Sequence, residues 1–334
     1  MKVSFDKKNI IKYLKKFMPL IGIIIFIYLI IDTGTDKILS TFLKISPIYV
    51  VIAATLTLPR ILIRNYAWQH IQKTQKIHIS YTKSLKIFLI GYFYGTITPG
   101  YLGQMMRVPY LKEETNQPIG KLFVNSIVET MTHTLSLYCM MIIGTFLVIE
   151  YIPEAFPVSC IVLIVTVFIY WYFFKKERGE RSFHFLIRIL IPKKIKPYFT
   201  RFVNTFYSDF PNVKTLIVPF IVGIPTWIII YTQIYILSIS LNIQIPYFVF
   251  ITLYPIANII SFIPITSAGL GTREASLIFL FSFFGVSPEI AIVISLSGHL
   301  MTDVLTGFYG LIISIFESRI DKTKLSDLNY FLEE

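Results

Sequence analysis

Long apolar runs separated by short polar segments make up most of the chain. Six such runs are candidates for membrane-spanning helices: 18–31, 47–63, 119–149, 156–174, 216–241 and 290–316. Two more apolar regions, 85–98 and 247–284, are interrupted by glycine and proline. The pattern predicts an all-α polytopic membrane protein in which residues 1–334 form a single integral membrane domain.

The composition supports this prediction, because 54% of the 334 residues are hydrophobic and the mean hydropathy is +0.67. No ordinary soluble domain has such a composition, and the polar remainder is too short for a separate catalytic domain. The N-terminus resembles a signal peptide, but no small-residue cleavage site follows Ile31, so we expect a retained first span. Cys139 and Cys160 both lie in apolar runs and give no metal-ligand spacing.

The formal net charge is +12, which in a soluble protein would first suggest nucleic-acid binding. Here Lys and Arg gather before the first span, after the second span and in 175–214, whereas 150–156, 242–246 and 285–289 have none. The positive-inside rule therefore predicts a multi-pass cell-membrane protein with both termini in the cytoplasm and no nucleic acid as a partner. The segment 175–214 mixes basic and apolar residues, and we expect it to lie on the anionic inner leaflet.

This assignment of the loops to the two sides of the membrane implies that neither interrupted region crosses the membrane once. The chain is cytoplasmic on both sides of 85–110, so this region must enter the membrane and return, with its break at TPGYLG (98–103). The region 247–284 does the same from outside, with its break at PITSAGLG (264–271). We therefore expect about six full spans and two re-entrant helical hairpins that enter from opposite sides.

The two interrupted regions belong to two halves with similar order. Pro118 and Pro288 are 170 positions apart, and at that offset MTHTL (131–135) aligns with MTDVL (301–305). The match predicts an inverted repeat, an architecture that many transporters share. The expected halves are approximately 40–150 and 215–316.

The second break carries an adjacent charge pair, Arg273 and Glu274, just after Gly269 and Gly271. Thr272 could cap a helix that begins there, which would place free backbone N–H groups and the positive end of a helix dipole inside the membrane. Arg273 adds a forked donor suited to phosphate, so this element is a candidate site for an anionic headgroup. Alternatively the two side chains simply pair with each other, but charges inside a membrane are costly and usually functional.

Other arginines are candidates for the same role. Arg107 follows the first break, after Gly100 and Gly103, and is either a second headgroup ligand or an interfacial cation on the returning chain. Arg60 and Arg64 lie one helical turn apart at the end of the second span. We expect them to anchor that span at the cytoplasmic interface or, alternatively, to meet an anionic headgroup at the mouth of a cavity.

Four further polar residues occupy the two matching long helices. Glu129 and His133 share one helix face, as do His299 and Asp303. Facing each other, the four could form a satisfied polar network, a proton relay or a metal site. The polar network is the first expectation, and no metal or other cofactor is predicted, because nothing in the sequence fixes the mutual rotation of the helices.

Three stretches resemble the lysylphosphatidylglycerol synthase transmembrane-region family: RNYAWQHI (64–71), TPGYLGQMMR (98–107) and PITSAGLGTREA (264–275). The resemblance covers roughly 18–316, and Gly-Leu-Gly-x-Arg-Glu is its most specific element. It implies a flippase-like domain that moves lipids between leaflets, with anionic or aminoacylated phospholipids and polyprenyl-phosphate lipids as cargo. In the bacterial proteins a lipid-aminoacylating domain follows, whereas a short charged tail follows Phe316 here, so we do not expect this chain to make the modified lipid.

The leading prediction is therefore a lipid flippase or scramblase, not an enzyme, that acts on an anionic headgroup. The sequence has no Walker-type glycine loop, so ATP is not expected to drive it directly. One alternative is a membrane-embedded enzyme that uses Glu129, His133, His299 and Asp303, although no G-x-S-x-G motif supports it. Another is a small-solute or ion transporter built on the same inverted plan. The sequence indicates no oligomeric state.

Overall fold

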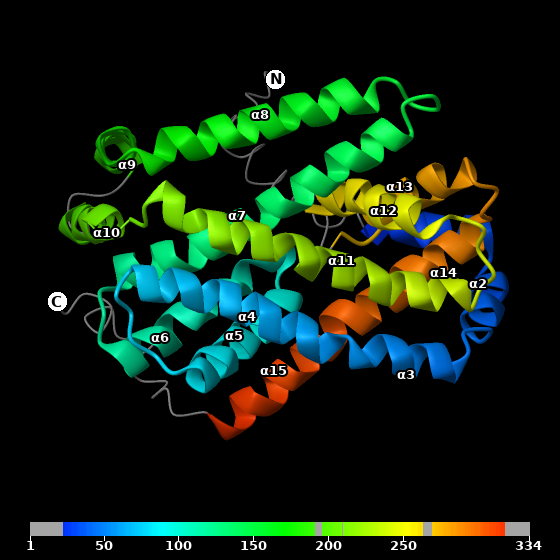
Figure 1. Cartoon of the computed structure of the whole chain (residues 1–334), viewed down its shortest axis with the longest axis horizontal. Coiled ribbons are helices and arrows are strands. Elements are labelled where there is room, and N and C mark those ends of the chain that lie inside the picture. The colour runs from blue at the N-terminus through cyan, green and yellow to red at the C-terminus, as the bar shows by residue number, and fades with distance from the viewer. Residues whose placement is uncertain (1–22, 191–195, 209, 263–268, 318–334) are drawn as a thin grey trace, which may run out of the picture.

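The computed structural model describes residues 23–190, 196–208, 210–262 and 269–317, and every regular element within them is a helix (Figure 1). After a first helix at Ile23–Thr33, the elements of the first half are α2 (Thr35–Phe42), α3 (Pro47–Thr55), α4 (Thr57–Thr74), α5 (Tyr81–Thr96), η1 (Pro99–Met106), α6 (Arg107–Thr115) and α7 (Ile119–Leu147). They are followed by α8 (Ala155–Phe174), α9 (Lys176–Leu190), α10 (Lys196–Ser208), η2 (Val213–Leu216), α11 (Ile217–Ile239), α12 (Tyr247–Phe262), α13 (Thr272–Ser282), α14 (Pro288–His299), η3 (Leu300–Val304) and α15 (Leu305–Phe316).

The described residues contain five helices that are long and apolar enough to cross a membrane. They are Pro47–Thr74, Ile119–Leu147, Ala155–Phe174, Val213–Ile239 and Pro288–Phe316. The sequence predicted six, but the run at 18–31 begins outside the described residues and continues as the shorter apolar helix Ile23–Thr33. Because only part of that run is described, the sixth span stays a prediction. The protein is an all-α polytopic membrane protein.

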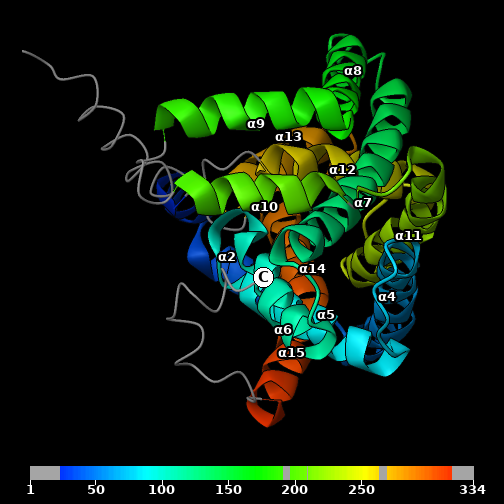
Figure 2. The ribbon, with the colours of Figure 1, turned by 90° about the vertical axis from the view of Figure 1, so that its left-hand side faces the viewer.

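The connections between the long helices lie at two opposite ends of the bundle (Figure 1). The loops after α7, α11 and α13 lie at one end, whereas the α4–α5 connection, α9 and α10 lie at the other. Figure 2 looks onto that second end and shows α9 and α10 lying across it, roughly perpendicular to the long helices. Most of the predicted basic segment is therefore laid flat over one end of the bundle.

Each interrupted region folds back on itself. α5 packs against η1 and α6, and the chain between them turns at Gly100 and Tyr101, whose φ angles are 62° and 56°. α12 packs in the same way against α13, and the segment 263–268 between them lies outside the described residues. The first hairpin lies toward the end that carries α9 and α10, and the second lies toward the opposite end (Figure 1).

The hairpin of each half packs against the other half. α5 packs on α15, and α12 packs on α7, so each hairpin lies against a long helix of the other half. A Cβ atom on Gly310 would lie 2.0 Å from the carbonyl oxygen of Leu89, and one on Gly144 would lie 1.8 Å from that of Thr252. Only glycine permits backbones to approach this closely, as in other membrane helix pairs. The exchange favours the inverted repeat, which stays a prediction together with the position of the hairpins in a bilayer.

Candidate functional site

A polar cavity of about 290 Å³ lies between the two hairpins and the long helices. Its lining comes from α4, α5, η1, α7, α11, α12, α13, α14 and η3, so both sequence breaks contribute to one space. The charged and imidazole side chains that line it are Arg60, Arg64, His133, Arg273, His299 and Asp303. Such a concave site with convergent polar groups inside an apolar bundle is the best candidate for a functional site.

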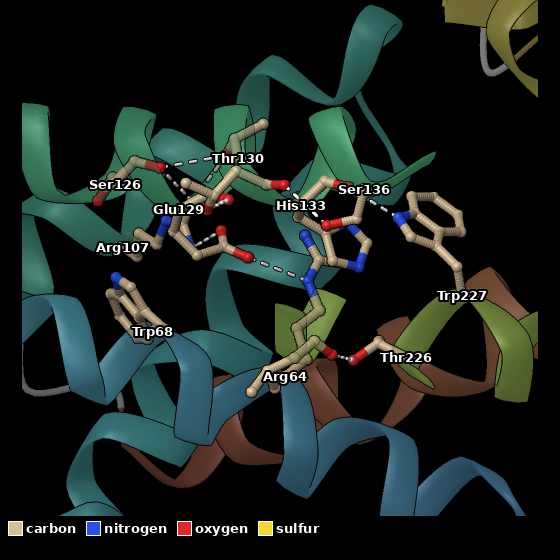
Figure 3. A network of polar contacts seen from close by, with 12 residues as sticks. Arg64, Trp68, Arg107, Ser126, Glu129, Thr130, His133, Ser136, Thr226 and Trp227 are labelled. Carbon is tan, nitrogen blue, oxygen red and sulfur yellow. Dashed lines mark hydrogen bonds and ion pairs between the residues drawn. The ribbon is translucent and has the colours of Figure 1, made fainter. Parts of the chain in front are cut away.

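Glu129 is the centre of one ion-pair network beside the cavity (Figure 3). Its Oε1 accepts a hydrogen bond from Arg64 Nε at 3.1 Å, and its Oε2 accepts one from Arg107 Nη1 at 2.9 Å. Arg64 also lies over the ring of Phe88, 5.3 Å from its centroid. Within the described residues the terminal nitrogens of Arg64 have no protein hydrogen-bond partner, and the residue lines the cavity. Arg64 can therefore offer donors to a ligand while Glu129 holds it in place.

Arg107 has a different position from the one expected. It is only 1% exposed and is not part of the cavity lining. Its Nη2 donates to Ser126 O at 2.8 Å and to Thr130 Oγ1 at 3.1 Å, and its guanidinium lies 4.9 Å from the Trp68 ring (Figure 3). The interpretation of Arg107 as an interfacial cation was wrong, because its charge is buried against Glu129. It also reaches no headgroup in this arrangement, and Arg64 occupies the cavity instead.

The second network surrounds Arg273 at the start of α13. Arg273 Nε donates to Ser295 Oγ at 2.7 Å, and its Nη2 donates to Glu274 Oε1 at 3.1 Å. Ser295 Oγ also donates to that same Glu274 oxygen at 2.6 Å. Arg273 is 4% exposed and lines the cavity, so the predicted pairing with Glu274 and the predicted cavity position occur together.

The helix cap at this break differs from the expectation. Gly271, with φ 85°, is the N-cap of α13, and Thr272 is the first residue of the helix. Thr272 Oγ1 donates to Gly269 O, whereas the Glu274 carboxylate accepts from the Gly271 N–H at 2.6 Å. Thr272 is therefore not the cap, because Glu274 at N3 reaches back and satisfies the first free N–H group itself. Gly269 is buried beside the break and also has a positive φ, of 76°.

The glycines of the first break have separate roles. Gly100 lines the cavity. Gly103 lies against the backbone of α5, where a Cβ atom would be 2.0 Å from Tyr94 O, so it serves the tight folding of the hairpin.

Arg60 is buried rather than interfacial. It is 3% exposed, and its Nη2 donates to Thr302 O at 2.8 Å and to Thr306 Oγ1. Its Nε is buried without a hydrogen-bond partner. The expectation of a cytoplasmic anchor was wrong for Arg60, because α4 turns this face inward, toward η3 of the other half.

His299 directly precedes a π-helical turn that the sequence did not indicate, and Asp303 lies within that turn. This turn, η3 (Leu300–Val304), interrupts the long helix between α14 and α15. His299 Nδ1 and Asp303 Oδ2 are 3.0 Å apart, and Asp303 Oδ1 accepts from Tyr92 Oη at 2.7 Å. Turns of this kind occur frequently at functional sites.

The four residues of the predicted polar quartet do not form one cluster. Glu129 binds arginines, and the ring of His133 packs against Trp227 with centroids 4.4 Å apart and the ring planes tilted by 33° (Figure 3). His133 Nε2 is buried without a partner, and His133 lines the cavity. Within the described chain no hydrogen bond joins Glu129 or His133 to His299 or Asp303, and no group of three or more metal-ligating side chains is present.

Sequence reasoning missed several residues of the site, including Tyr92, Tyr101, Trp227 and Ser295. Ser295 had a usable signal, because the 170-residue offset aligns it with Asn125. Asn125 Oδ1 accepts from Trp68 Nε1 at 2.8 Å, so both positions carry polar groups that hold the site. Tyr101 directly follows Gly100 in the first break, but nothing in the sequence shows that a tyrosine there adopts a positive φ.

Comparison with known proteins decides the family. The model of the family described as lysylphosphatidylglycerol synthase TM region matches residues 18–310. The chain belongs to this family. A UPF0104 membrane protein of Methanocaldococcus jannaschii is 24% identical over 97% of this chain and 99% of its own length. Two UPF0104 membrane proteins of Methanothermobacter thermautotrophicus are each 20% identical, over 84% and 94% of this chain and over 88% and 98% of their own lengths. In this lysylphosphatidylglycerol synthase TM-region protein, both sequence breaks and all three cavity arginines lie inside the matched residues.

Proposed function

We propose that the protein moves lipids with anionic headgroups between the two leaflets of the membrane. The observation that carries this proposal is that Arg60, Arg64 and Arg273, from both halves, line one cavity inside an apolar bundle. An anionic phosphate cannot cross a bilayer core without partners, because its charge loses water and gains nothing in return. Guanidinium groups are the donors that phosphate binds best.

An apolar pocket next to the cavity favours a lipid over a small solute. This second pocket has a volume of about 570 Å³ and is lined almost entirely by apolar residues of the α2–α3 region, α3, α11 and the α14–α15 helix. Leu300 and Met301 face it, whereas Thr302 and Asp303 of the same π-helical turn face the polar cavity. A polar space and an apolar space on either side of one helical turn suit a molecule with a charged head and hydrocarbon tails, including a phospholipid or polyprenyl phosphate. A small polar solute has no hydrocarbon part that would bind in the apolar pocket.

The enzyme alternative has less support. The described residues hold no group of three or more metal-ligating side chains, and the quartet on which the enzyme hypothesis depended is divided between two networks. We therefore propose transport without chemical conversion and without a cofactor.

We further propose that the end covered by α9 and α10 faces the cytoplasm. Lys175, Lys176, Arg181, Arg188 and Arg201 are exposed there, beside the exposed apolar side chains of Phe185 and Phe199. A flat helix with both kinds of side chain binds an anionic membrane surface. We propose the cytoplasmic side of the cell membrane for both termini as well, on the positive-inside rule alone.

Reconstitution in liposomes tests the proposed transport. Purified protein is incorporated with a phosphatidylglycerol that carries a fluorophore on one chain, and an impermeant reductant reports how much of it reaches the outer leaflet. We expect Arg273→Ala to abolish translocation and Arg273→Lys to keep part of it, because Lys keeps the charge without the fork. Arg188→Ala, which removes an exposed arginine of α9, serves as the matched control. Normal translocation by a well-folded Arg273→Ala protein would exclude this cavity as the path.

A further inference from the structure

The three carboxylates of the site differ in the kind of cation that holds each of them. Glu129 is paired with Arg64 and Arg107, and Glu274 with Arg273. Arginine stays protonated at every ordinary pH, so the arginine partners of these two carboxylates keep their charge. Asp303 instead has His299 as its cationic partner, 3.0 Å away. Histidine is the side chain whose charge changes near neutral pH, so this pair alone among the three can gain or lose a proton there.

The position of this pair connects it to the cavity. His299 and Asp303 both line it, with side chains that are 17% and 16% exposed, more than those of Glu129 and Glu274 at 2% and 0%. His299 precedes the π-helical turn and Asp303 lies within it, next to Thr302, whose carbonyl oxygen accepts a hydrogen bond from Arg60. A proton at this pair therefore has a route from the cavity and changes the charge of the same space that the proposed anion enters.

The charges of the site sum to a small positive value. Four arginines, Arg60, Arg64, Arg107 and Arg273, face Glu129, Glu274 and Asp303, which leaves one positive charge when the histidines are neutral. A proton on His299 or Asp303 raises this by one unit. Any ligand that carries a negative charge then binds better, by Coulomb attraction in a site of low dielectric constant.

On this basis, and resting on the proposed lipid transport, we propose that the cavity binds its anionic lipid together with one proton, held by the His299–Asp303 pair. Because linkage is reciprocal, lipid binding promotes protonation of the pair as much as protonation promotes lipid binding. A proton gradient would then be able to drive the lipid in one direction, as a symported ion does.

Other titratable groups face the pair from the elements packed around it, and each is a competing proton site or a source of field. They are Tyr92 from α5, Tyr101 from η1, Arg60 and Arg64 from α4, His133 from α7, Tyr254 from α12 and Arg273 from α13. Tyrosine and arginine keep their protonation state near neutral pH. His133, whose Nε2 has no partner, is therefore the competitor that an experiment must separate from His299.

Calorimetric binding measurements test the proposal. Dihexanoyl phosphatidylglycerol is the probe, because its phosphodiester does not titrate between pH 6 and 8. It is titrated into the full-length protein in detergent at one pH in buffers of different ionisation enthalpy, and the dependence of the observed heat on the buffer gives the number of protons taken up. We expect uptake of up to about one proton per lipid, and an affinity that falls up to about tenfold per pH unit once the pair is deprotonated.

Variants assign the proton. His299→Gln and Asp303→Asn should each bind the probe without proton uptake and with an affinity that no longer changes with pH. His133→Gln, although it changes the cavity lining, should keep the native proton uptake per bound lipid, and His78→Gln, at an exposed loop position, should behave like the native protein. Native uptake in both His299→Gln and Asp303→Asn, or loss of uptake in His133→Gln instead, would overturn the proposal.

The binding measurements distinguish failure of the proton site from failure of the proposed function. Binding of the lipid by the native protein without any proton uptake overturns the proton site and leaves the proposed function intact. No detectable binding by the native protein, or unchanged binding by Arg273→Ala, counts against the proposed function itself, and the proton site falls with it.

Discussion

Arg64 and Glu129 join α4 to α7 through an ion pair of 3.1 Å, and the same carboxylate binds Arg107 on α6 at 2.9 Å. One acidic side chain thus pairs with two arginines that have different surroundings. Arg107 is 1% exposed and serves the fold, whereas the Arg64 side chain is 11% exposed and lines the cavity. Glu129 therefore couples the packing of the first hairpin to the placement of a cavity donor.

The first prediction follows from this shared carboxylate. Glu129→Gln should destabilise the protein by about 3–5 kcal/mol, because it leaves the buried charge of Arg107 without a counter-ion. Thermal unfolding in detergent, followed by near-ultraviolet circular dichroism, measures the loss. Arg107→Met combined with Glu129→Gln should recover a large part of it, because the buried charge is removed with its partner. Equal stability of the single and double variants would contradict the ion-pair argument.

Gly144 and Gly310 provide a test of the exchanged packing. Gly310→Ala should loosen the contact between α15 and α5, and Gly144→Ala the contact between α7 and α12, because each added Cβ would meet a backbone carbonyl oxygen at 2.0 Å or less. Both variants should unfold at lower temperature than the native protein. Ile315→Ala, at an exposed position of α15, is the matched control. Similar effects from Gly144→Ala and Gly310→Ala are expected if the two halves are related by an inverted repeat.

Several parts of the fold could be read from the sequence because they depend on local chemistry. Glycine and proline at 98–103 located the first break, and the run of charges at 175–214 identified the segment that lies across one end of the bundle. Gly271 and Glu274 similarly indicated the start of α13, although the cap was assigned to the wrong residue. In each case the signal is the conformational preference or solvation of a few neighbouring residues.

The remaining features depend on how helices rotate against each other, and a single sequence does not contain that information. The same apolar pattern around Arg60 fits an interfacial or an inward orientation, and only packing against Thr302 and Thr306 selects the second. The hydropathy pattern around Glu129 fits a side chain that faces His299 equally well as one that faces Arg107. The π-helical turn at Leu300–Val304 likewise has no glycine or proline to indicate it.

The orientation of the bundle makes a third prediction. Arg188 is exposed on α9 and Gln244 is exposed in the loop before α12, at opposite ends of the molecule (Figure 1). In a background where Cys139 and Cys160 are replaced by Ala, Arg188→Cys should react with an impermeant maleimide only after cells are opened. Gln244→Cys should react in intact cells. Reaction of both from the same side would disprove the topology, and the cysteine-free background controls for nonspecific labelling.

The last prediction concerns Tyr101, which lines the cavity with φ 56° and ψ 21°. A tyrosine in this left-handed region costs about 1–2 kcal/mol, and residues under such strain persist where the surrounding structure holds them for a function.

Tyr101→Ala and Tyr101→Gly both remove the ring, but only alanine keeps the unfavourable φ. Alanine is normally the more stable of the two by about 0.5–1 kcal/mol inside a helix. Here the order should reverse, with the glycine variant unfolding at the higher temperature. In the liposome assay both variants should translocate lipid more slowly than the native protein, because both lack the Tyr101 ring that lines the cavity. A glycine variant that is more stable than the alanine variant yet equally slow would separate the strain of the backbone from the role of the ring. Native rates in both variants would show that the strained tyrosine serves the hairpin and not the transported lipid.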